Sequence, residues 1–500
     1  MQFRSIVILL FSLACAEIIV AQSFNHWTRS FNEESSLLSG AVVGGGAWPS
    51  AIYYNPASIS EITASKISFH ASLFSYRIYD IKNALGDGNH LNWSSLQIEP
   101  RFLSYMIKPK NHPEWSLELA FLNNENHRLD VAQSLDRRID ILKQIPGEER
   151  YFATFQYLNR YRDDWIGIGW SWRLSQRLSI GASMFITIKT HEYHYKLNIE
   201  AYPIDTSQGM AIEDFYSASY QDVEYLKYND YRLLWKIGLL HKWDRLSLGI
   251  CLTTPSVGGI YSDGKRVSRI RNQTNITDPE NGAFMPDYYI GDYKEKNEVT
   301  VNHKTPISCA AGLTWHSKNR NQIFYSTIEY FGDIEAYKIV EAHEGADIAT
   351  GSVTANIEMN EWLTFVSGAR PVLNAALGYS WTINEKLLLM AGIRSDFNYI
   401  KDFNYKHYEE TQAMKNLAVD NYHISGGLSW NIIGQDIITG LQYTIGRETD
   451  QEQIINLSDP VEYNIEEQSP LQGARQNNVS SLINSLSIYV GATFNFGEKN

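Results

Sequence analysis

The sequence predicts an all-β fold, a transmembrane antiparallel β-barrel of about 14 strands with an N-terminal hatch inside its lumen. Three observations predict it. Apolar residues recur with a period of two along most of the chain. The alternating stretches form hairpins of one design, and short turns alternate with long polar insertions. Aromatic residues make up 13% of the chain, with 31 Tyr and 13 Trp, an excess typical of β-rich proteins with interfacial side chains.

The N-terminus has the pattern of a secretory signal peptide. Arg4 supplies a positive charge, an apolar stretch follows from Ile6 to Val20, and small and polar residues come next. We expect residues 1–21 to form the signal peptide, with cleavage after Ala21; a cut after Ala16 is the alternative. Beyond this segment no stretch reaches the roughly 18 apolar residues that a membrane helix requires.

The net charge argues against a nucleic-acid partner, and the cysteine positions argue against a disulfide. The formal net charge is −13, so the chain has no basic surface suited to neutralising nucleic-acid phosphates, and we expect no nucleic-acid partner. Cys15 leaves with the signal peptide. Cys251 and Cys309 lie on opposite faces of their predicted strands, so we expect two free thiols and no disulfide.

The hairpin pattern is clearest in "WIGIGWSWRLSQRLSIGASMFI", residues 165–186. Apolar side chains alternate with small or polar ones on both sides of a short polar turn at 175–177, which predicts a tight β-hairpin with one apolar face. Four more hairpins of the same design follow, at residues 233–252, 307–330, 373–393 and 424–445.

Long polar insertions separate these hairpins. They run roughly from Ala201 to Tyr228, Pro255 to Thr300, Phe331 to Gly368, Asp402 to Asp420 and Glu448 to Ser481. Short turns at one end and long loops at the other are typical of bacterial outer-membrane barrels. Closure follows from the membrane, because an open sheet edge in hydrocarbon would leave backbone groups unpaired.

The predicted strands begin with Lys66 to Asp80 and end with Leu486 to Phe496. We interpret Glu148 to Asp163 as part of a loop, with room for a helix, because an extra strand would break the even count expected of bacterial barrels. The alternative fold is a secreted β-sandwich or propeller. Strands often longer than about ten residues, with Trp and Tyr toward their ends, favour the membrane barrel.

The segment from Gln22 to Ser65 does not alternate as a barrel strand would. Gly44, Gly45 and Gly46 permit backbone conformations closed to other residues, and Asn55-Pro56 predicts a turn. A loop-rich segment before the first strand is a candidate plug of the lumen. We therefore divide the chain into a signal peptide (1–21), a hatch (22–65) and a barrel (66–500).

At this point the sequence resembles a known family. "GAVVGGGAWPSAIYYNPASIS" is similar to the N-terminal hatch of the FadL/TodX-like outer-membrane transporters, in which a Gly-rich approach precedes an aromatic residue and Asn-Pro-Ala. "WRLSQRLSIGAS", "DRLSLGICLTTPS" and "NEKLLLMAGIRSDFN" resemble that family's repeat of a short turn, a Leu-rich strand start and a glycine. The matching hatch positions are Tyr54, Asn55, Pro56 and Ala57.

The resemblance implies a barrel in the bacterial outer membrane through which hydrophobic compounds, such as long-chain fatty acids or hydrocarbons, enter passively past the hatch. The partners it implies are a hydrophobic small molecule, outer-membrane lipid and lipopolysaccharide, and the barrel-assembly machinery, which recognises a final strand that closes on an aromatic residue. The family's ligand-pocket residues form no motif that can be placed on this chain.

Two uses remain open for the apolar residues that face inward. Leu388 and Met390 face opposite to Leu387 and Leu389, and they either line an apolar path or pack against the hatch. The alternative function is a partner-binding barrel that acts as a shuttle or assembly factor for secreted proteins, with the large loops holding the partner.

No catalytic or metal-binding motif is found. His191 and His194 fall on opposite faces of a strand, which makes a shared metal improbable. His423 and Ser425 share a face and hint at a lipid-hydrolysing enzyme, but positions two apart on a strand lie roughly 6.6 to 7 Å apart, too far for a direct hydrogen bond. We expect no enzyme activity, no cofactor and no metal.

Overall fold

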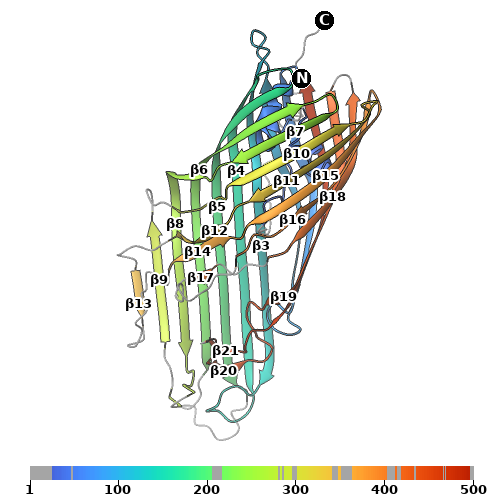
Figure 1. The fold of residues 1–500 in the computed structure, drawn as a ribbon. Coiled ribbons are helices and arrows are strands. Elements are labelled where there is room, and N and C mark those ends of the chain that lie inside the picture. Colours follow the sequence, from blue (N-terminus) through green and yellow to red (C-terminus); the bar gives the residue numbers. More distant parts are fainter. Residues whose placement is uncertain are drawn as a thin grey trace, which may run out of the picture.

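Fourteen of the described strands close into an antiparallel barrel (Figure 1). β22 pairs with β1 along nearly their whole length and completes the ring. The prediction of a closed barrel with fourteen strands is therefore confirmed. In ring order the strands are β1 (Lys66–Lys82), β2 (Leu91–Ile107), β3 (Trp115–Ile139), β4 (Glu149–Arg173), β5 (Leu178–Pro203), β6 (Ala218–Lys242), β7 (Leu246–Thr253), β10 (Ser308–His316), β11 (Gln322–Phe331), β15 (Val372–Asn384), β16 (Leu387–Asp396), β18 (Asn421–Ile432), β19 (Gln435–Glu452) and β22 (Asn477–Asn495).

The computed structural model describes residues 25–495 apart from 47–48, 205–216, 280–281, 284–286, 296–300, 341–346, 351–362, 402–411, 414–417, 433–434, 466 and 468. The predicted signal peptide (1–21) and the C-terminal aromatic residue Phe496 lie outside this part of the chain. No helix among the described residues is long and apolar enough to cross a membrane.

All five predicted hairpins form. They are the pairs β4–β5, β6–β7, β10–β11, β15–β16 and β18–β19, each joined by a short turn at the same end of the barrel (Figure 1). We call this the turn end and the opposite end the distal end.

The outer face of the wall carries a belt of exposed apolar side chains. On β4, Ile166 is 50% exposed and Ile168 is 47% exposed, and all five hairpins contribute such residues. Exposure of this much apolar surface to water would be costly, so the belt marks the part of the wall that contacts lipid. Cys251 is buried and Cys309 is exposed, and both are free thiols, as expected.

The prediction of a loop over Glu148 to Asp163 is wrong. Residues 149–163 belong to β4, which pairs with β3 and β5 along its whole length. The strand count stays even because the residues prolong an existing strand beyond the belt. Outward positions there are polar, such as Arg150 and Arg162, and Arg150 Nε donates a 2.9 Å hydrogen bond to Asp136 Oδ1.

The inward face of the long strands is polar within the belt and apolar beyond it. Within the belt of β5, inward positions such as Ser179 and Ser183 are small and polar. Beyond it, inward Tyr193, Tyr195 and Leu197 are buried and apolar. The alternation continues without a break, while the outer surroundings change from lipid to water.

The predicted long loops also contain strands. β6 begins at Ala218, and β8 (Val257–Thr274), β9 (Asp287–Glu295) and β13 (Asp347–Thr350) extend the sheet from the distal half of β6. β12 (Ile334–Val340), β14 (Phe365–Ala369) and β17 (Gln412–Ala413) form one small sheet, and β20 (Val461–Asn464) and β21 (Ser469–Gln472) form another. Most of the predicted loop from Asp402 to Asp420 lies outside the described residues.

These insertions pack on the inward face of the long strands. Leu142, Phe365, Leu457 and Leu471 are buried in one cluster with the inward aromatic residues of β4 and β5. The distal end therefore has its own hydrophobic core, which forms a cap over the lumen. Periodicity alone did not reveal it, because the packed insertions are polar in composition and irregular in spacing.

We predict that a charge is tolerated beyond the belt and not within it. Ile168→Arg should lower the free energy of unfolding of the barrel in lipid by about 2–4 kcal/mol, the cost of an arginine near the bilayer centre. Gln156→Arg, at an outward and exposed position of the same strand, should change it by less than about 0.5 kcal/mol. Urea titration of both variants in phospholipid vesicles measures this, and equal effects would contradict the assignment of the belt.

Candidate functional site

The residues before β1 lie inside the barrel and reach across its lumen. They form α2 (Glu33–Leu37), α3 (Ala51–Tyr54) and the 3-10 helix η1 (Pro56–Glu61). α2 contacts β16, β18, β19 and β22, whereas η1 contacts β3 to β6 on another side of the wall. Nearly all described residues from Arg29 to Ile62 are buried. We call residues 25–65 the lumen segment.

Inward-facing glycines of the wall form the seat of this segment. A Cβ at Gly181 of β5 would lie 2.6 Å from the amide nitrogen of Ala57, and one at Gly392 of β16 would lie 2.6 Å from the carbonyl carbon of Leu38. Any larger residue would collide with backbone. The glycine that follows each Leu-rich strand start in the sequence thus has a physical reason, the close approach of the lumen segment.

Asn55 fixes the turn between the two helices and ties it to the wall. Its side-chain Oδ1 accepts a 3.1 Å hydrogen bond from the Ala57 amide and caps η1. Its Nδ2 donates to the carbonyl oxygens of Val43, at 2.9 Å, and Leu239 of β6, at 3.2 Å. Asn55 is 1% exposed, so each of these bonds replaces one that water would otherwise supply.

The other three residues of the motif, Pro56, Ala57 and Tyr54, pack around this turn without comparable hydrogen bonds to the described residues of the wall. Pro56 begins η1, where its missing amide hydrogen costs nothing, and it holds Asn55 in extended backbone. Ala57 is fully buried. Tyr54 packs between the apolar clusters of the lumen segment and the wall.

Tyr53 is a contact residue that the sequence reasoning missed. Its ring lies 5.6 Å from that of Trp165 and 4.2 Å from the ammonium nitrogen of Lys236, a cation–π arrangement. Its position beside Tyr54 in the motif was the available signal.

A cavity of about 110 Å³ lies in the lumen between the lumen segment and the distal cap. Aromatic rings of the wall, the lumen segment and the cap supply much of its lining, and ionisable groups from β3, β4 and β5 complete it. The lining includes His26, Asn124, Glu125, Tyr161, Asp163, Trp165, Lys189, His191, Tyr228, His303, Tyr337 and Tyr399.

Some of the polar groups of this cavity pair with one another. Lys189 Nζ lies 2.8 Å from Asp163 Oδ2 and donates a 2.9 Å hydrogen bond to the Tyr161 hydroxyl. Burial lowers the pKa of His26 to about 3, and burial together with nearby cations lowers the pKa of His303 well below its usual value. Both imidazoles are therefore neutral at pH 7. The His26 ring stacks with Phe331 and Tyr399, and the His303 ring stacks with Tyr161.

One side of this cavity reaches an interruption in the wall. β2 and β3 pair only from Phe102–Leu122 to Ile107–Leu117, so their distal halves are not paired with each other. At the same level β3 carries a bulge, because Asn123 faces Asp164 and Glu125 faces Asp163, leaving Asn124 as an extra residue. Asn124 and Glu125 line the cavity.

The lumen segment is bound to this bulge. Arg29 donates hydrogen bonds to the side-chain oxygen of Asn123 and, at 3.2 Å, to the carbonyl oxygen of Asn126. Movement of the lumen segment is thus coupled by direct contact to the edge of the interrupted wall.

The histidines and the serine that the sequence offered for other chemistry each have a place in the structure. His191 is buried with Asn159 and Tyr228, while His194 lies on the outward face. His423 Nδ1 lies 2.7 Å from Thr444 Oγ1, whereas the Ser425 hydroxyl donates to the Leu37 carbonyl oxygen at 2.9 Å.

Met390 is buried against Leu37 and Leu38, and Leu388 packs at the edge of the same cluster. Met390 therefore packs against the lumen segment, whereas Leu388 also lines a cavity at the turn end.

Comparisons with known proteins identify similar structures. No protein-family model matches the chain, and no curated protein matches it by sequence. The Pseudomonas putida toluene transporter TodX superposes with a TM-score of 0.55 at 13% identity, covering 94% of this chain and 99% of that one. A Pseudomonas aeruginosa FadL homologue gives 0.53 at 12%, covering 95% and 100%. The Ralstonia pickettii toluene transporter TbuX gives 0.53 at 11%, covering 94% and 99%. The chain therefore has the fold of these barrels.

We predict that the glycine seat holds the lumen segment in place. Gly181→Ala puts a methyl group against backbone and should destabilise the protein by about 1–3 kcal/mol, the usual cost of overpacking. Limited proteolysis of the purified protein should then cut the lumen segment faster than in wild type. In the matched control Gly426→Ala, the added Cβ has its nearest neighbour at 3.7 Å, and cleavage should be unchanged. Equal protection in both variants would rule out the seat.

Proposed function

We propose that this protein is an outer-membrane channel for the passive uptake of hydrophobic compounds. The observation that carries the proposal is the lumen cavity beside an interrupted wall, in a barrel with an apolar belt and a plugged lumen. The similar structures point the same way, since two of them are named as toluene transporters and one as a FadL homologue.

The lumen segment acts as the hatch in this proposal. It crosses the lumen at the level of the belt, and Asn55 and the wall glycines hold it there. Tyr54, Asn55, Pro56 and Ala57 then maintain the closed state, and they border the path of a solute without binding it directly.

The solute enters from the distal end and leaves sideways into the bilayer. An apolar molecule gains little from entering the water beyond the hatch, whereas transfer to lipid is favourable by roughly 25 cal/mol per Å² of apolar surface. The bulge at Asn124 and the unpaired distal halves of β2 and β3 provide that exit.

The size of the cavity bears on the class of compound. Cavities of about 150 Å³ hold one benzene molecule, so a space of about 110 Å³ is close to a single aromatic ring. A hydrocarbon ring fits with small adjustments of the lining. A long-chain fatty acid requires the hatch or the cap to move.

Support for the alternatives is weaker. The partner-binding role calls for apolar surface at the distal end, but the described apolar residues of the cap are mostly buried in their own core. A non-enzymatic role agrees with the partners observed for His423 and Ser425. In this proposal outer-membrane lipid and lipopolysaccharide surround the belt, and the barrel-assembly machinery inserts the chain.

We predict that deletion of Asn124 closes the lateral exit. The deletion removes the extra residue and leaves the β3–β4 register continuous, since Asn123 and Glu125 already face neighbouring residues of β4. A bacterial host that makes the wild-type protein should take up radiolabelled toluene faster than the empty-vector strain, and the deletion should return uptake to that background. Undiminished uptake with a correctly folded barrel would exclude this route.

We predict that Asn55 governs occupancy of the cavity. Asn55→Ala leaves two buried carbonyl groups without their donor, at a cost of about 1–3 kcal/mol, and should loosen the hatch beneath the cavity. Native mass spectrometry with lipid extraction should find a stoichiometric apolar ligand on the wild-type protein and a weaker one on the variant. The control is Asn111→Ala, in an exposed turn. A co-purifying protein with no apolar ligand would favour the partner-binding barrel instead.

A further inference from the structure

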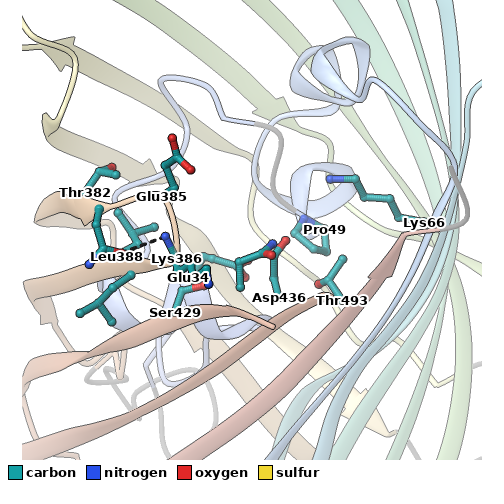
Figure 2. Close-up of a pocket in the computed structure, with 13 residues that line it drawn as sticks. Glu34, Pro49, Lys66, Thr382, Glu385, Lys386, Leu388, Ser429, Asp436 and Thr493 are labelled. Carbon is teal, nitrogen blue, oxygen red and sulfur yellow. Dashed lines mark hydrogen bonds between the residues drawn. The ribbon is translucent and has the colours of Figure 1, made fainter. Parts of the chain in front are cut away.

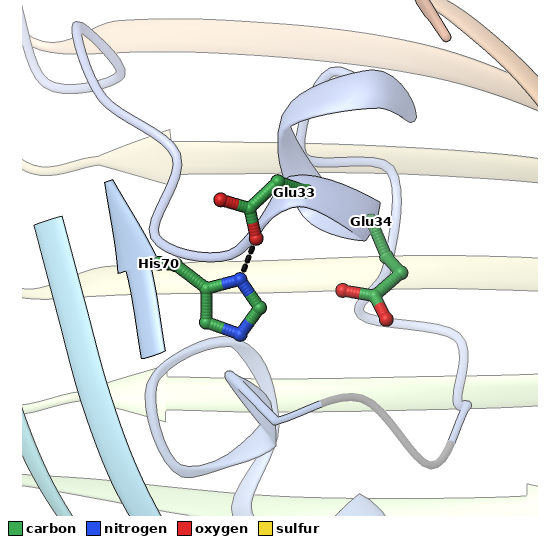
Figure 3. Close-up of side chains that lie close together, drawn as sticks. All are labelled: Glu33, Glu34 and His70. Carbon is green, nitrogen blue, oxygen red and sulfur yellow. Dashed lines mark ion pairs between the residues drawn. The ribbon is translucent and has the colours of Figure 1, made fainter. Parts of the chain in front are cut away.

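Two glutamates of the hatch and one histidine of the wall form a buried cluster. Glu33 and Glu34 are consecutive residues of α2, and His70 lies on β1 (Figure 3). One potential ligand atom from each residue lies within 4.8 Å of the other two. Glu33 is 2% exposed, Glu34 is 8% exposed and His70 is 1% exposed.

This cluster contains potential metal-ligand atoms that have no hydrogen-bond partner in the described part of the surrounding protein. His70 Nδ1 contacts the Glu33 carboxylate, and His70 Nε2 is buried with no hydrogen-bond partner among the described residues. Two carboxylates buried side by side are costly unless a cation compensates their charge. A dication bound by all three side chains would satisfy both requirements.

A glycine of the wall leaves space for the cluster. Gly491 of β22 faces His70 across the seam that closes the barrel. A Cβ at Gly491 would collide with both the Glu33 carboxylate and the His70 ring. Glycine at this position therefore provides the space in which the three ligand groups meet.

An entry path leads to the cluster from the turn end. A cavity of about 350 Å³ is lined there by Glu34, Lys66, Lys386 and Asp436, among others (Figure 2). Glu34 thus belongs to both the cluster and the cavity wall. A hydrated ion that reaches the cavity finds three carboxylates, of Glu34, Glu385 and Asp436, in its lining.

We propose that Glu33, Glu34 and His70 bind one transition-metal dication, which ties the hatch to the seam of the barrel. One imidazole nitrogen and two carboxylate groups suit zinc and similar ions, with water from the cavity completing the coordination. Calcium and magnesium prefer oxygen ligands alone and are disfavoured by the histidine. The bound ion stabilises the closed position of α2, because it is held only when hatch and wall are together.

No sequence pattern predicts this site. Two adjacent glutamates and a histidine 36 positions later match no metal motif, and we expected no metal. Only the folding of α2 against β1 brings the three side chains together.

The test is zinc binding to tag-free, full-length protein in detergent after removal of metals with a chelator. Isothermal titration calorimetry should find one equivalent of Zn²⁺ bound by wild type. Glu33→Gln and Glu34→Gln preserve shape and should each weaken binding by at least about tenfold, since even groups that only support a ligand contribute 10–100-fold. Added Zn²⁺ should raise the thermal unfolding midpoint of wild type and of neither variant.

A matched control separates this site from adventitious binding. His112 and Glu114 form an exposed pair, 3.2 Å apart, in the turn between β2 and β3. His112→Ala should bind zinc as wild type does. The proposal is overturned if correctly folded wild type, judged by its heat-modifiable migration, binds no zinc, or if both Gln variants bind it unchanged. Neither result would affect the uptake measurements, so the two proposals fail independently.

Discussion

A membrane-spanning wall must pair its backbone groups within itself, because hydrocarbon offers them no partner. The antiparallel seam between β1 and β22 meets this requirement and turns a sheet into a closed barrel. Where pairing between β2 and β3 stops, other groups take over part of the task, and Arg29 of the lumen segment donates a hydrogen bond to the backbone of β3 there. The lumen segment is thus in direct contact with the interrupted part of the wall.

Solvent decides which face of each long strand is apolar. β4 and β5 keep the same alternation for about 25 residues. Lipid surrounds their first or last third, depending on strand direction, and there the outward side chains are apolar. Beyond the belt the outward side chains meet water, and the apolar residues turn to the inside, where the cap packs on them. One strand therefore serves as both membrane wall and soluble domain.

The position of the lumen segment depends on the absence of side chains from the wall. Glycines on several strands let its backbone approach within van der Waals contact, which gives many weak contacts and fixes its position without a covalent link. Asn55 adds directional bonds on one side of the lumen, and the cluster of Glu33, Glu34 and His70 adds a polar attachment on another.

The sequence by itself determined the architecture. A period of two, five short turns and the Asn55-Pro56 turn each depend on neighbours in the chain, so they predicted the hairpins, the fourteen strands and the segment before β1. Tertiary structure alone decided how far the strands extend, because residues 149–163 alternate in a polar context that resembled a loop until β3 and β5 were seen to flank them. It also decided the cavity, the bulge and the proposed metal cluster. Lys189 meets Asp163 across a strand pair, and His70 of the wall meets Glu33 of the lumen segment. Local spacing carries no information about contacts of that kind.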